Sequence, residues 1–171
     1  MEWVISDTHF GHSNIIDYEN RPFRDAEEMD KVMIDNWNSV VGEKDTVWHL
    51  GDFFLTYTER QFEIFDQLNG NIILIRGNHD KQSRTKLIER IGFAEVYDEY
   101  YLTNNDMITL LTHRPILNVA YMEKEGIDFN IHGHKHSVDK QYSPFHYCVS
   151  AENINYTPVK LEEIINEYRS N

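Results

Sequence analysis

The chain has little cysteine, no long apolar run and no cluster of basic residues among its 171 positions. Its one cysteine, Cys148, excludes a disulfide within the chain and is typical of a reducing compartment, so we expect a small buried side chain there. No apolar run approaches the ~20 residues that a membrane-spanning helix needs. Strand-like sequence begins close to Met1, which leaves no room for a cleaved signal peptide. We therefore expect a cytoplasmic protein without a membrane segment.

The charge balance is strongly acidic, with 16 Lys and Arg against 29 Asp and Glu and a net charge of −13 at pH 7. A chain this acidic repels phosphate backbones in general, and it has no Lys- or Arg-rich run that would counter this. Stable binding of DNA or RNA is therefore disfavoured. The sequence also lacks internal repeats, linkers and low-complexity segments, and its length is typical of one domain. We predict a single domain over residues 1–171.

Helix signals alternate with short apolar runs along the chain. This alternation predicts an α/β fold with parallel strands in the first half and a second, more mixed sheet, packed on the first, in the second half. The predicted helices are Asp25–Val41, Thr58–Leu68, Arg84–Ile91 and Leu161–Tyr168. The strands predicted in the second half are Ala94–Thr103, Met107–Thr112, Asp128–His132 and Phe145–Val149.

Five apolar runs are each followed directly by polar residues that can bind a metal. Because strand ends of an α/β sheet meet at one edge, where active sites form, we expect these side chains to lie together. The runs are 3–5, 47–50, 72–75, 107–111 and 129–131. The residues that follow them are Asp7 and His9, Asp52, Asn78 with His79 and Asp80, His113, and His134 with His136.

The types and spacing of these residues indicate a catalytic metal site. Asp7 and His9 are two residues apart, so both side chains point to one side of an extended segment, and His134 and His136 repeat this spacing. The carboxylate of Asp52 can bridge two cations. Imidazole and carboxylate ligands suit Mn, Fe, Zn or Ni rather than Ca or Mg, and a site without cysteine is more often catalytic than structural. The alternative is a set of turn residues and surface histidines, and five ordered motifs at strand ends argue against it.

The whole series resembles the motifs of the calcineurin-like metallophosphoesterase superfamily, and the likeness extends from Val4 to about Val149. The segment from Ile5 to Phe23 resembles small bacterial and phage members. The resemblance implies a four-layer α/β/β/α sandwich of two mixed sheets flanked by helices. It also implies two divalent transition-metal ions, with Mn²⁺ expected and Fe, Zn or Ni as alternatives. The implied ligands are Asp7, His9 and His136 for the first ion, Asn78, His113 and His134 for the second, and Asp52 between them.

The resemblance further implies hydrolysis of phosphoester bonds by a hydroxide that bridges the two ions. His79 follows the ligand Asn78 and is the expected general acid that protonates the leaving group. Asp80 would orient the His79 ring and favour its charged form. The alternative for His79 is an ordinary surface histidine.

Three further residues are candidates for substrate binding. Arg21 could pair with a phosphate oxygen or, equally, with a carboxylate. His12 could line the pocket as a proton donor or substrate contact, or it could be a structural histidine. Asn14 could touch the substrate or make a local turn contact. We expect the substrate loops in segments 12–24 and 112–126, because specificity in such folds resides in loops.

The leading hypothesis for function is a metal-dependent phosphodiesterase that acts on small nucleotide-type substrates. Two divalent ions bring four positive charges, of which Asp7 and Asp52 cancel two, so the site can attract an anion despite the acidic chain. A phosphomonoesterase or a nuclease on the same site is the alternative. A non-catalytic interaction scaffold is a different class of function, and the complete ligand set argues against it. Aromatic residues near Tyr97–Tyr101 could pair subunits in a homo-oligomer.

Overall fold

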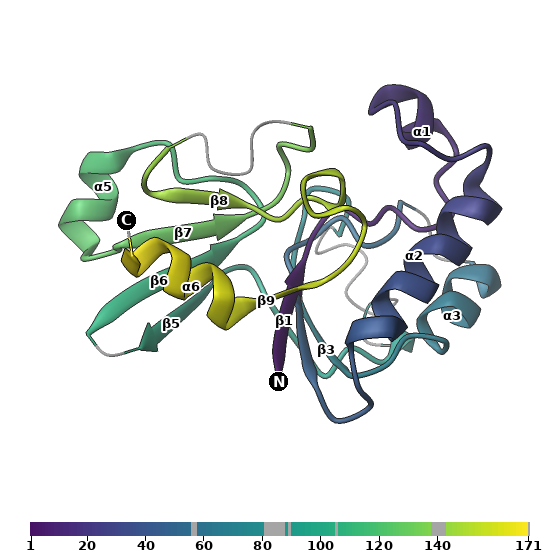
Figure 1. The fold of residues 1–171 in the computed structure, drawn as a ribbon, viewed down its shortest axis with the longest axis horizontal. Coiled ribbons are helices and arrows are strands. Elements are labelled where there is room, and N and C mark those ends of the chain that lie inside the picture. The colour runs from purple at the N-terminus through teal and green to yellow at the C-terminus, as the bar shows by residue number, and fades with distance from the viewer. Residues whose placement is uncertain (56–57, 81–87, 89, 105, 138–142, 171) are drawn as a thin grey trace.

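The computed structural model describes residues 1–55, 58–80, 88, 90–104, 106–137 and 143–170. Two β-sheets lie between helices on opposite sides of the molecule (Figure 1). This arrangement confirms the predicted α/β architecture of two mixed sheets flanked by helices.

The first sheet has the strand order β4-β3-β2-β1-β9. Strands β1 to β4 run parallel, and β9 is antiparallel to β1. The carboxyl ends of β1, β2 and β3 therefore lie at one edge, and the first three ligand motifs follow them. The strands are β1 (Glu2–Ile5), β2 (Thr46–His49), β3 (Asn71–Ile75), β4 (Glu95–Tyr97) and β9 (Val159–Lys160).

The second sheet has the order β5-β6-β7-β8, with β5 antiparallel to β6 and the other pairs parallel. Its strands are β5 (Tyr100–Asn104), β6 (Met107–Thr112), β7 (Phe129–His132) and β8 (His146–Cys148). The backbone joins the two sheets just beyond β1 and β8. There Ser6 N donates to Val149 O at 2.9 Å, and Ala151 N donates to Ser6 O at 3.0 Å. The ligand-bearing edges of both sheets are thereby held together.

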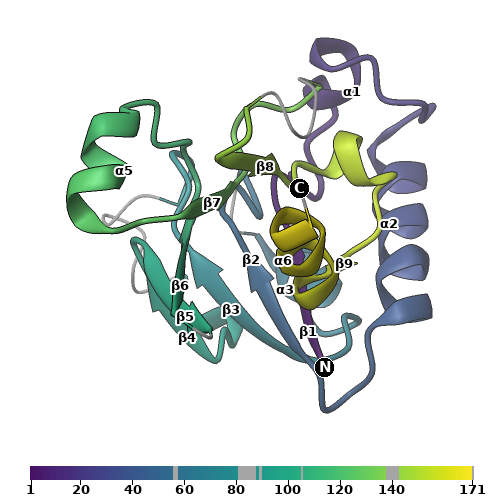
Figure 2. The same cartoon turned by 60° about the vertical axis from the view of Figure 1, so that its left-hand side comes forward.

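Helices cover the two outer faces. Helices α2 (Ala26–Val40) and α3 (Glu59–Phe65) flank the first sheet, and α5 (Val119–Glu125) lies on the opposite side, beyond the second sheet (Figures 1 and 2). Helix α6 (Leu161–Ser170) follows β9 and packs beside β1. Two further short elements lie within the described ranges, α1 (Asn14–Tyr18) and the 3-10 helix η2 (Ala151–Ile154).

Local sequence explains where α2 begins and which face it buries. Asp25 has an extended backbone, and its Oδ1 accepts the N–H of Glu28 at 2.9 Å, which satisfies one of the free donors of the first turn. Met29, Met33 and Trp37 follow at helical spacing and are almost fully buried against the first sheet. The predicted helix is therefore confirmed, with its N-cap at the predicted residue.

Strand β6 shows how the second sheet buries both of its faces. Met107 and Leu111 belong to the main apolar cluster, which also contains the side chains between the sheets. Leu110, with Ile108 packed beside it, belongs to a separate cluster around Met122 of α5. Alternate residues of a strand point to opposite faces, so one apolar strand can pack against the first sheet on one side and against α5 on the other.

The structure differs from the sequence predictions in the second half. The predicted strand Ala94–Thr103 is two strands, β4 and β5, which belong to different sheets. Exposed Asp98 and Glu99 separate them where the chain crosses from one sheet to the other. The expected loops 12–24 and 112–126 contain α1 and α5. The predicted helix Arg84–Ile91 falls mostly outside the described residues. Within the described ranges, no helix is long and apolar enough to cross a membrane.

Candidate metal centre

Most of the predicted ligands lie on turns with an uncommon backbone conformation. Five of the seven have positive φ: Asp7 at 57°, His9 at 51°, Asp52 at 57°, His134 at 68° and His136 at 43°. Non-glycine residues rarely adopt this region, and each such residue costs about 1–3 kcal/mol. The surrounding structure must hold these turns against local preference, and such strain is typical of functional sites.

Asp7 presents one fixed and one available oxygen. Its Oδ2 accepts hydrogen bonds from Ser6 Oγ at 2.6 Å, from Ser150 Oγ at 2.8 Å and from His134 N at 2.8 Å. Its Oδ1 is buried, has no hydrogen-bond partner among the described residues, and lies 3.7 Å from His136 Nε2. The protein therefore fixes the orientation of the carboxylate and leaves Oδ1 to bind a cation.

His9 and His136 complete the first predicted ligand group. His9 is 2% exposed, and neither of its ring nitrogens has a hydrogen-bond partner in the described part of the chain. Burial lowers the pKa of His9 well below its usual value, which keeps the imidazole neutral, as coordination requires. The ring of His136 stacks on that of His9 with centroids 5.4 Å apart. Asp7, His9 and His136 each offer a ligand atom within 4.8 Å of the others, as a shared cation requires.

Asp52 lies between the two predicted ligand groups. Its Oδ1 accepts the N–H of His79 at 2.9 Å. Its Oδ2 lies 3.9 Å from His9 Nε2 and 3.4 Å from His113 Nε2. Burial opposes ionisation, but the contacts with His113 and the His79 N–H outweigh it and hold the pKa of Asp52 well below its ordinary value. Asp52 is therefore a carboxylate placed where a bridging ligand would be needed.

The second predicted ligand group surrounds His113. Its Nδ1 donates to Leu50 O at 2.8 Å, so Nε2 points into the site, 3.0 Å from Asn78 Oδ1. The ring of His134 meets that of His113 edge-on, with centroids 5.0 Å apart. Burial lowers the pKa of His113, but Asp52 raises it to about 9 in the metal-free chain, so a cation must displace this proton. The structure thus brings all seven predicted ligands to one place.

Two glycines allow the ligand loops to approach each other closely. A Cβ on Gly77 would lie 2.2 Å from Asp52 Oδ1, and a Cβ on Gly133 would lie 1.9 Å from Ser6 Oγ. Both distances are far inside van der Waals contact. The glycines of the Gly-Asn-His-Asp and Gly-His-Lys-His motifs are therefore required by the packing of the neighbouring ligand loop.

His79 and Asp80 lie at different depths. The His79 side chain is 38% exposed, and its Nε2 lies 3.8 Å from Asp52 Oδ2. Asp80 is fully buried, and its Oδ2 accepts backbone N–H groups from Asp52 at 2.7 Å and Gly77 at 3.0 Å. Asp80 thus ties together the loops that carry Asp52 and Asn78. Its predicted role as the partner that orients the His79 ring stays a prediction.

Arg21 faces the interior, which corrects its assignment as a phosphate contact. Its guanidinium donates to the backbone oxygens of Asp7 at 2.7 Å and Thr8 at 2.9 Å. Its Nη2 also lies 2.7 Å from Glu152 Oε1, and its side chain is 0% exposed. Of the two roles considered for Arg21, the structure supports pairing with a carboxylate. A buried guanidinium that is already paired and hydrogen-bonded cannot reach a substrate.

Glu152 is a part of the site that the sequence did not reveal. Its Oε1 accepts from His136 Nδ1 at 3.2 Å, which directs Nε2 of the same ring toward Asp7. Such a carboxylate behind a histidine ligand fixes its tautomer and orientation. Burial raises the pKa of Glu152, but His136 and Arg21 lower it by more. The pKa is therefore below its usual value, and the group stays charged. Glu152 belongs to no local motif, and only the join of the two sheets brings it to His136.

Of the remaining candidates, His12 lies beside the ligand His9, and Asn14 begins α1. The half-buried ring of His12 lies 5.7 Å from His9 and 6.4 Å from the exposed ring of Tyr18, centroid to centroid. Burial and the neighbouring His79 lower the pKa of His12. Asn14 is the exposed first residue of α1, and within the described chain no hydrogen bond links it to the ligand set. Substrate contact stays a prediction for both residues.

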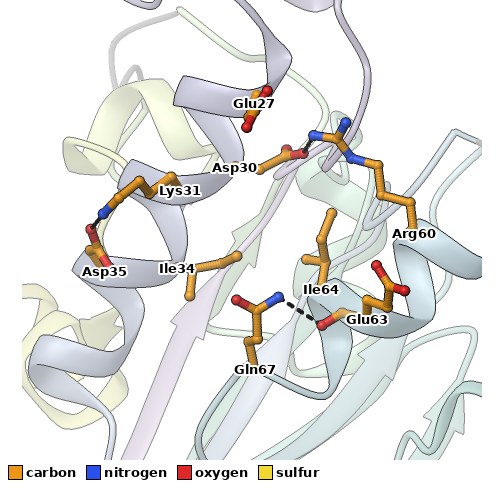
Figure 3. Close-up of a pocket in the computed structure, with 9 residues that line it drawn as sticks. All are labelled: Glu27, Asp30, Lys31, Ile34, Asp35, Arg60, Glu63, Ile64 and Gln67. Carbon is orange, nitrogen blue, oxygen red and sulfur yellow. Dashed lines mark hydrogen bonds and ion pairs between the residues drawn. The ribbon is translucent and has the colours of Figure 1, made fainter.

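Of two hollows in the described part of the chain, one adjoins the ligand set. One, of about 330 Å³, opens beside the ligands Asn78 and His113. Another, of about 570 Å³, lies between α2 and α3 and includes the ion pair of Asp30 with Arg60 (Figure 3). Asp30 also accepts the N–H of Gly11 at 2.7 Å, but none of the predicted site residues lines this second hollow. The first hollow is therefore the one adjoining the candidate metal centre.

Comparison with known proteins agrees with this geometry. Residues 2–150 match the family model of the calcineurin-like phosphoesterase superfamily domain. The chain belongs to this superfamily. It is 40% identical over 172 residues to the uncharacterized protein MJ1445 of Methanocaldococcus jannaschii, covering 95% of this chain and 88% of that one. It is also 40% identical over 81 residues to the gene 66 protein of Mycobacterium phage L5, covering 46% of this chain and 39% of that protein.

A solved structure is similar over the whole chain. The protein of unknown function AQ665 from Aquifex aeolicus superposes with a TM-score of 0.75 at 29% identity, and the match covers 98% of each chain. Members of the calcineurin-like phosphoesterase superfamily use divalent metal ions, and the assembled donors fit such ions. This fit rests on Asp7 Oδ1 and the two ring nitrogens of His9, which are buried and accept or donate no hydrogen bond within the described ranges. Membership confirms the family indicated by the motifs and leaves activity and substrate to be proposed.

Proposed function

We propose that the chain hydrolyses phosphodiester bonds of small nucleotide-type substrates at a centre of two divalent transition-metal ions. The observation that carries this proposal is a set of buried ligand atoms, Asp7 Oδ1 and both ring nitrogens of His9, for which the described residues supply no hydrogen-bond partner. Such atoms destabilise a folded chain by about 1–3 kcal/mol each unless something binds them. Imidazole and carboxylate ligands suit Mn, Fe, Zn or Ni, and from the resemblance to the family we propose Mn²⁺, with the other three as alternatives.

The bound ions would supply an activated water and neutralise the charge that develops on the phosphoryl oxygens. The protein holds the donors in place beforehand. Hydrogen bonds fix Oδ2 of Asp7, and the bond from Nδ1 to Leu50 O fixes the ring of His113. Donors held in this way need little reorganisation during the reaction, which lowers its barrier.

His79 is the proposed general acid. Its ring lies at the partly exposed rim of the site, with its centroid 5.6 Å from that of His9. A proton donor in this position can reach a leaving-group oxygen without serving as a metal ligand. Asp80 helps to position His79, because its Oδ2 accepts backbone N–H groups from the loop that carries Asp52 and from Gly77 in the loop that carries His79.

The net charge of −13 supports a small substrate. A phosphodiester carries one negative charge, whereas a nucleic acid strand carries one at each phosphate, so the acidic chain opposes the approach of a polymer more strongly. A nuclease is therefore the less favoured alternative, and a phosphomonoesterase remains an alternative that the experiment below decides.

The test combines metal stoichiometry with hydrolysis. We expect two ions per chain after reconstitution with Mn²⁺, measured by elemental analysis. We also expect faster hydrolysis of bis(p-nitrophenyl) phosphate than of p-nitrophenyl phosphate. Asp52→Asn should lose at least one ion and nearly all activity, because the amide is neutral and bridges poorly. The control Asp35→Asn removes an equal charge from an exposed position on α2 and should change neither result.

Each contrary outcome identifies a different error. Fewer than one ion per chain would contradict the metal centre itself. Two ions without hydrolysis of either ester would favour the non-catalytic scaffold. Faster hydrolysis of the monoester would favour a phosphomonoesterase on the same residues.

A further inference from the structure

The hollow beside Asn78 and His113 extends well beyond the ligand set. Its volume of about 330 Å³ exceeds what one phosphate group fills and reaches the lower end of small-molecule sites, about 300 Å³. It can therefore hold the part of a substrate that lies next to the scissile phosphate. Besides the ligands Asn78 and His113, its lining includes the charged residues Arg76, Asp98, Glu99 and Arg114.

Arg114 is the cation of this hollow that has no carboxylate partner. It directly follows the ligand His113, it is exposed, and within the described chain no carboxylate forms an ion pair with it. Its Nη2 lies 3.5 Å from Asn78 Oδ1, which is long for an N–H···O hydrogen bond. If Asn78 Oδ1 held a metal ion, this weak contact would compete with the ion, and the guanidinium would be free to turn to another acceptor.

The second arginine of the hollow is already engaged. Arg76 donates to Asp80 O at 3.4 Å, and its Nε lies 3.6 Å from Asp98 Oδ1. Its side chain is 16% exposed, so it forms part of the wall. The acidic Glu99 accepts a hydrogen bond from the hydroxyl of Tyr101 at 3.4 Å. Arg114 is therefore the residue of the hollow best placed to bind an added anion.

We propose that Arg114 binds a second phosphate group of the substrate, next to the phosphodiester that is cleaved. A guanidinium binds phosphate through two parallel N–H···O bonds, a geometry that lysine cannot reproduce. The inference rests on the proposed function, which places the scissile group at the ligand set. The substrate class is then a nucleotide-type phosphodiester that carries an additional phosphate.

The first test compares two esters with the same leaving group and the same scissile bond. These are thymidine 5′-(p-nitrophenyl phosphate) and its 3′-phosphorylated form. In the Mn²⁺-loaded parent, we expect kcat/KM to be at least roughly tenfold higher for the 3′-phosphorylated ester, because one charge-assisted hydrogen bond alone supplies about that factor. Arg114→Met should abolish this preference, and Arg114→Lys should retain only part of it. The control Lys31→Met removes one positive charge from an exposed position on α2 and should retain the full preference.

The second test measures binding without turnover, so that it can be separated from the proposed activity. Calorimetry on the Mn²⁺-loaded protein should find thymidine 3′,5′-bisphosphate bound roughly tenfold more tightly than thymidine 5′-monophosphate, and Arg114→Met should equalise them. If the binding preference is found but neither ester is hydrolysed, the phosphate site at Arg114 is supported and the proposed function is overturned. Equal binding in the parent would overturn the proposal. Equal weakening of both ligands by Arg114→Met would also overturn it, because Arg114 would then contact the group at the metal centre.

Discussion

His79 and Glu152 differ in their relation to the ligand set although each lies beside it. The side chain of His79 is 38% exposed at the rim, whereas that of Glu152 is 7% exposed behind His136. His79 completes neither predicted coordination group, so its loss should affect the chemistry more than metal binding. Glu152 acts through His136, so its loss should affect metal binding first.

The prediction for His79→Ala is therefore retention of both ions with a rate loss of roughly 10²–10⁴-fold, the usual contribution of a general acid. The loss should be largest for diesters with alkoxide leaving groups and much smaller for p-nitrophenolate, which departs without a proton. A series of leaving groups on parent and variant measures this. Equal loss across the series would mean that His79 orients the phosphate, and loss of metal would mean that it is a ligand.

The prediction for Glu152→Gln is a roughly 10–100-fold weaker affinity for one of the two ions, the usual effect of removing a carboxylate behind a histidine ligand. The other ion should be unaffected, because His113 and Asn78 do not contact Glu152. Metal titration by calorimetry measures both affinities. Glu163→Gln is the control, because it removes an equal charge from an exposed position on α6 and should change neither affinity. Equal weakening of both ions would indicate a general loss of structure instead.

At the scale of elements, the turn after β7 contacts turns that follow strands of both sheets. Gly133 N donates to His113 O at 3.0 Å. The position that a Cβ would take on Gly133 lies against the side chains of Ser6 and Asp7, just after β1. The turns after β1, β6 and β7 are therefore packed on one another, and each carries a predicted ligand. A change at Gly133 should be transmitted to both sheets.

Gly133→Ala should destabilise the protein by roughly 1–3 kcal/mol, the usual cost of overpacking, and should weaken metal binding. The added Cβ would lie 1.9 Å from Ser6 Oγ and 2.5 Å from Asp7 Oδ2, so one of these groups must move. Urea unfolding and metal titration measure the two effects. Gly42→Ala is the control, because its Cβ would meet Asp45 Oδ2 at an ordinary 3.5 Å. An unchanged metal affinity in Gly133→Ala would show that Asp7 tolerates the displacement.

At the scale of the whole molecule, the join of the sheets buries titratable groups that the ligand set does not use. His49 at the end of β2 is 0% exposed, and its Nε2 lies 3.1 Å from Thr8 Oγ1. Burial lowers the pKa of His49 from 6.5 to about 3. In the unfolded chain the same ring regains its ordinary pKa near 6.5. Between these values the unfolded chain binds a proton that the folded chain does not.

The neutral His49 of the metal-free protein should therefore stabilise the folded state fully above pH 6.5, where the unfolded chain no longer binds the extra proton. This contribution should fall by about 1.4 kcal/mol per pH unit as the pH drops from 6.5 toward 3. Urea unfolding of parent and His49→Gln between pH 4.5 and 7 isolates it, because the glutamine does not titrate. We expect the parent to lose stability more steeply than the variant in this range. Parallel curves would mean that His49 is protonated in the folded protein.

Much of the fold could be predicted because its signals are local. The runs before Asp7, Asp52, Asn78, His113 and His134 are all strands, as predicted, since apolar periodicity and flanking glycines are properties of short segments. The split of Ala94–Thr103 could not be predicted. Both halves are strand-like, and only the sheet that each half joins distinguishes them.

The sequence by itself determined the family and the donor atoms, because the types of ligand side chain and their order along the chain are fixed by covalent structure. Only the tertiary structure decided how those atoms are used. Arg21 is a buried partner of Glu152, which is 131 positions away in the sequence. Arg114 lies beside Asn78, which is 36 positions away. Contacts at such separations depend on how the two sheets pack, and no local pattern encodes them.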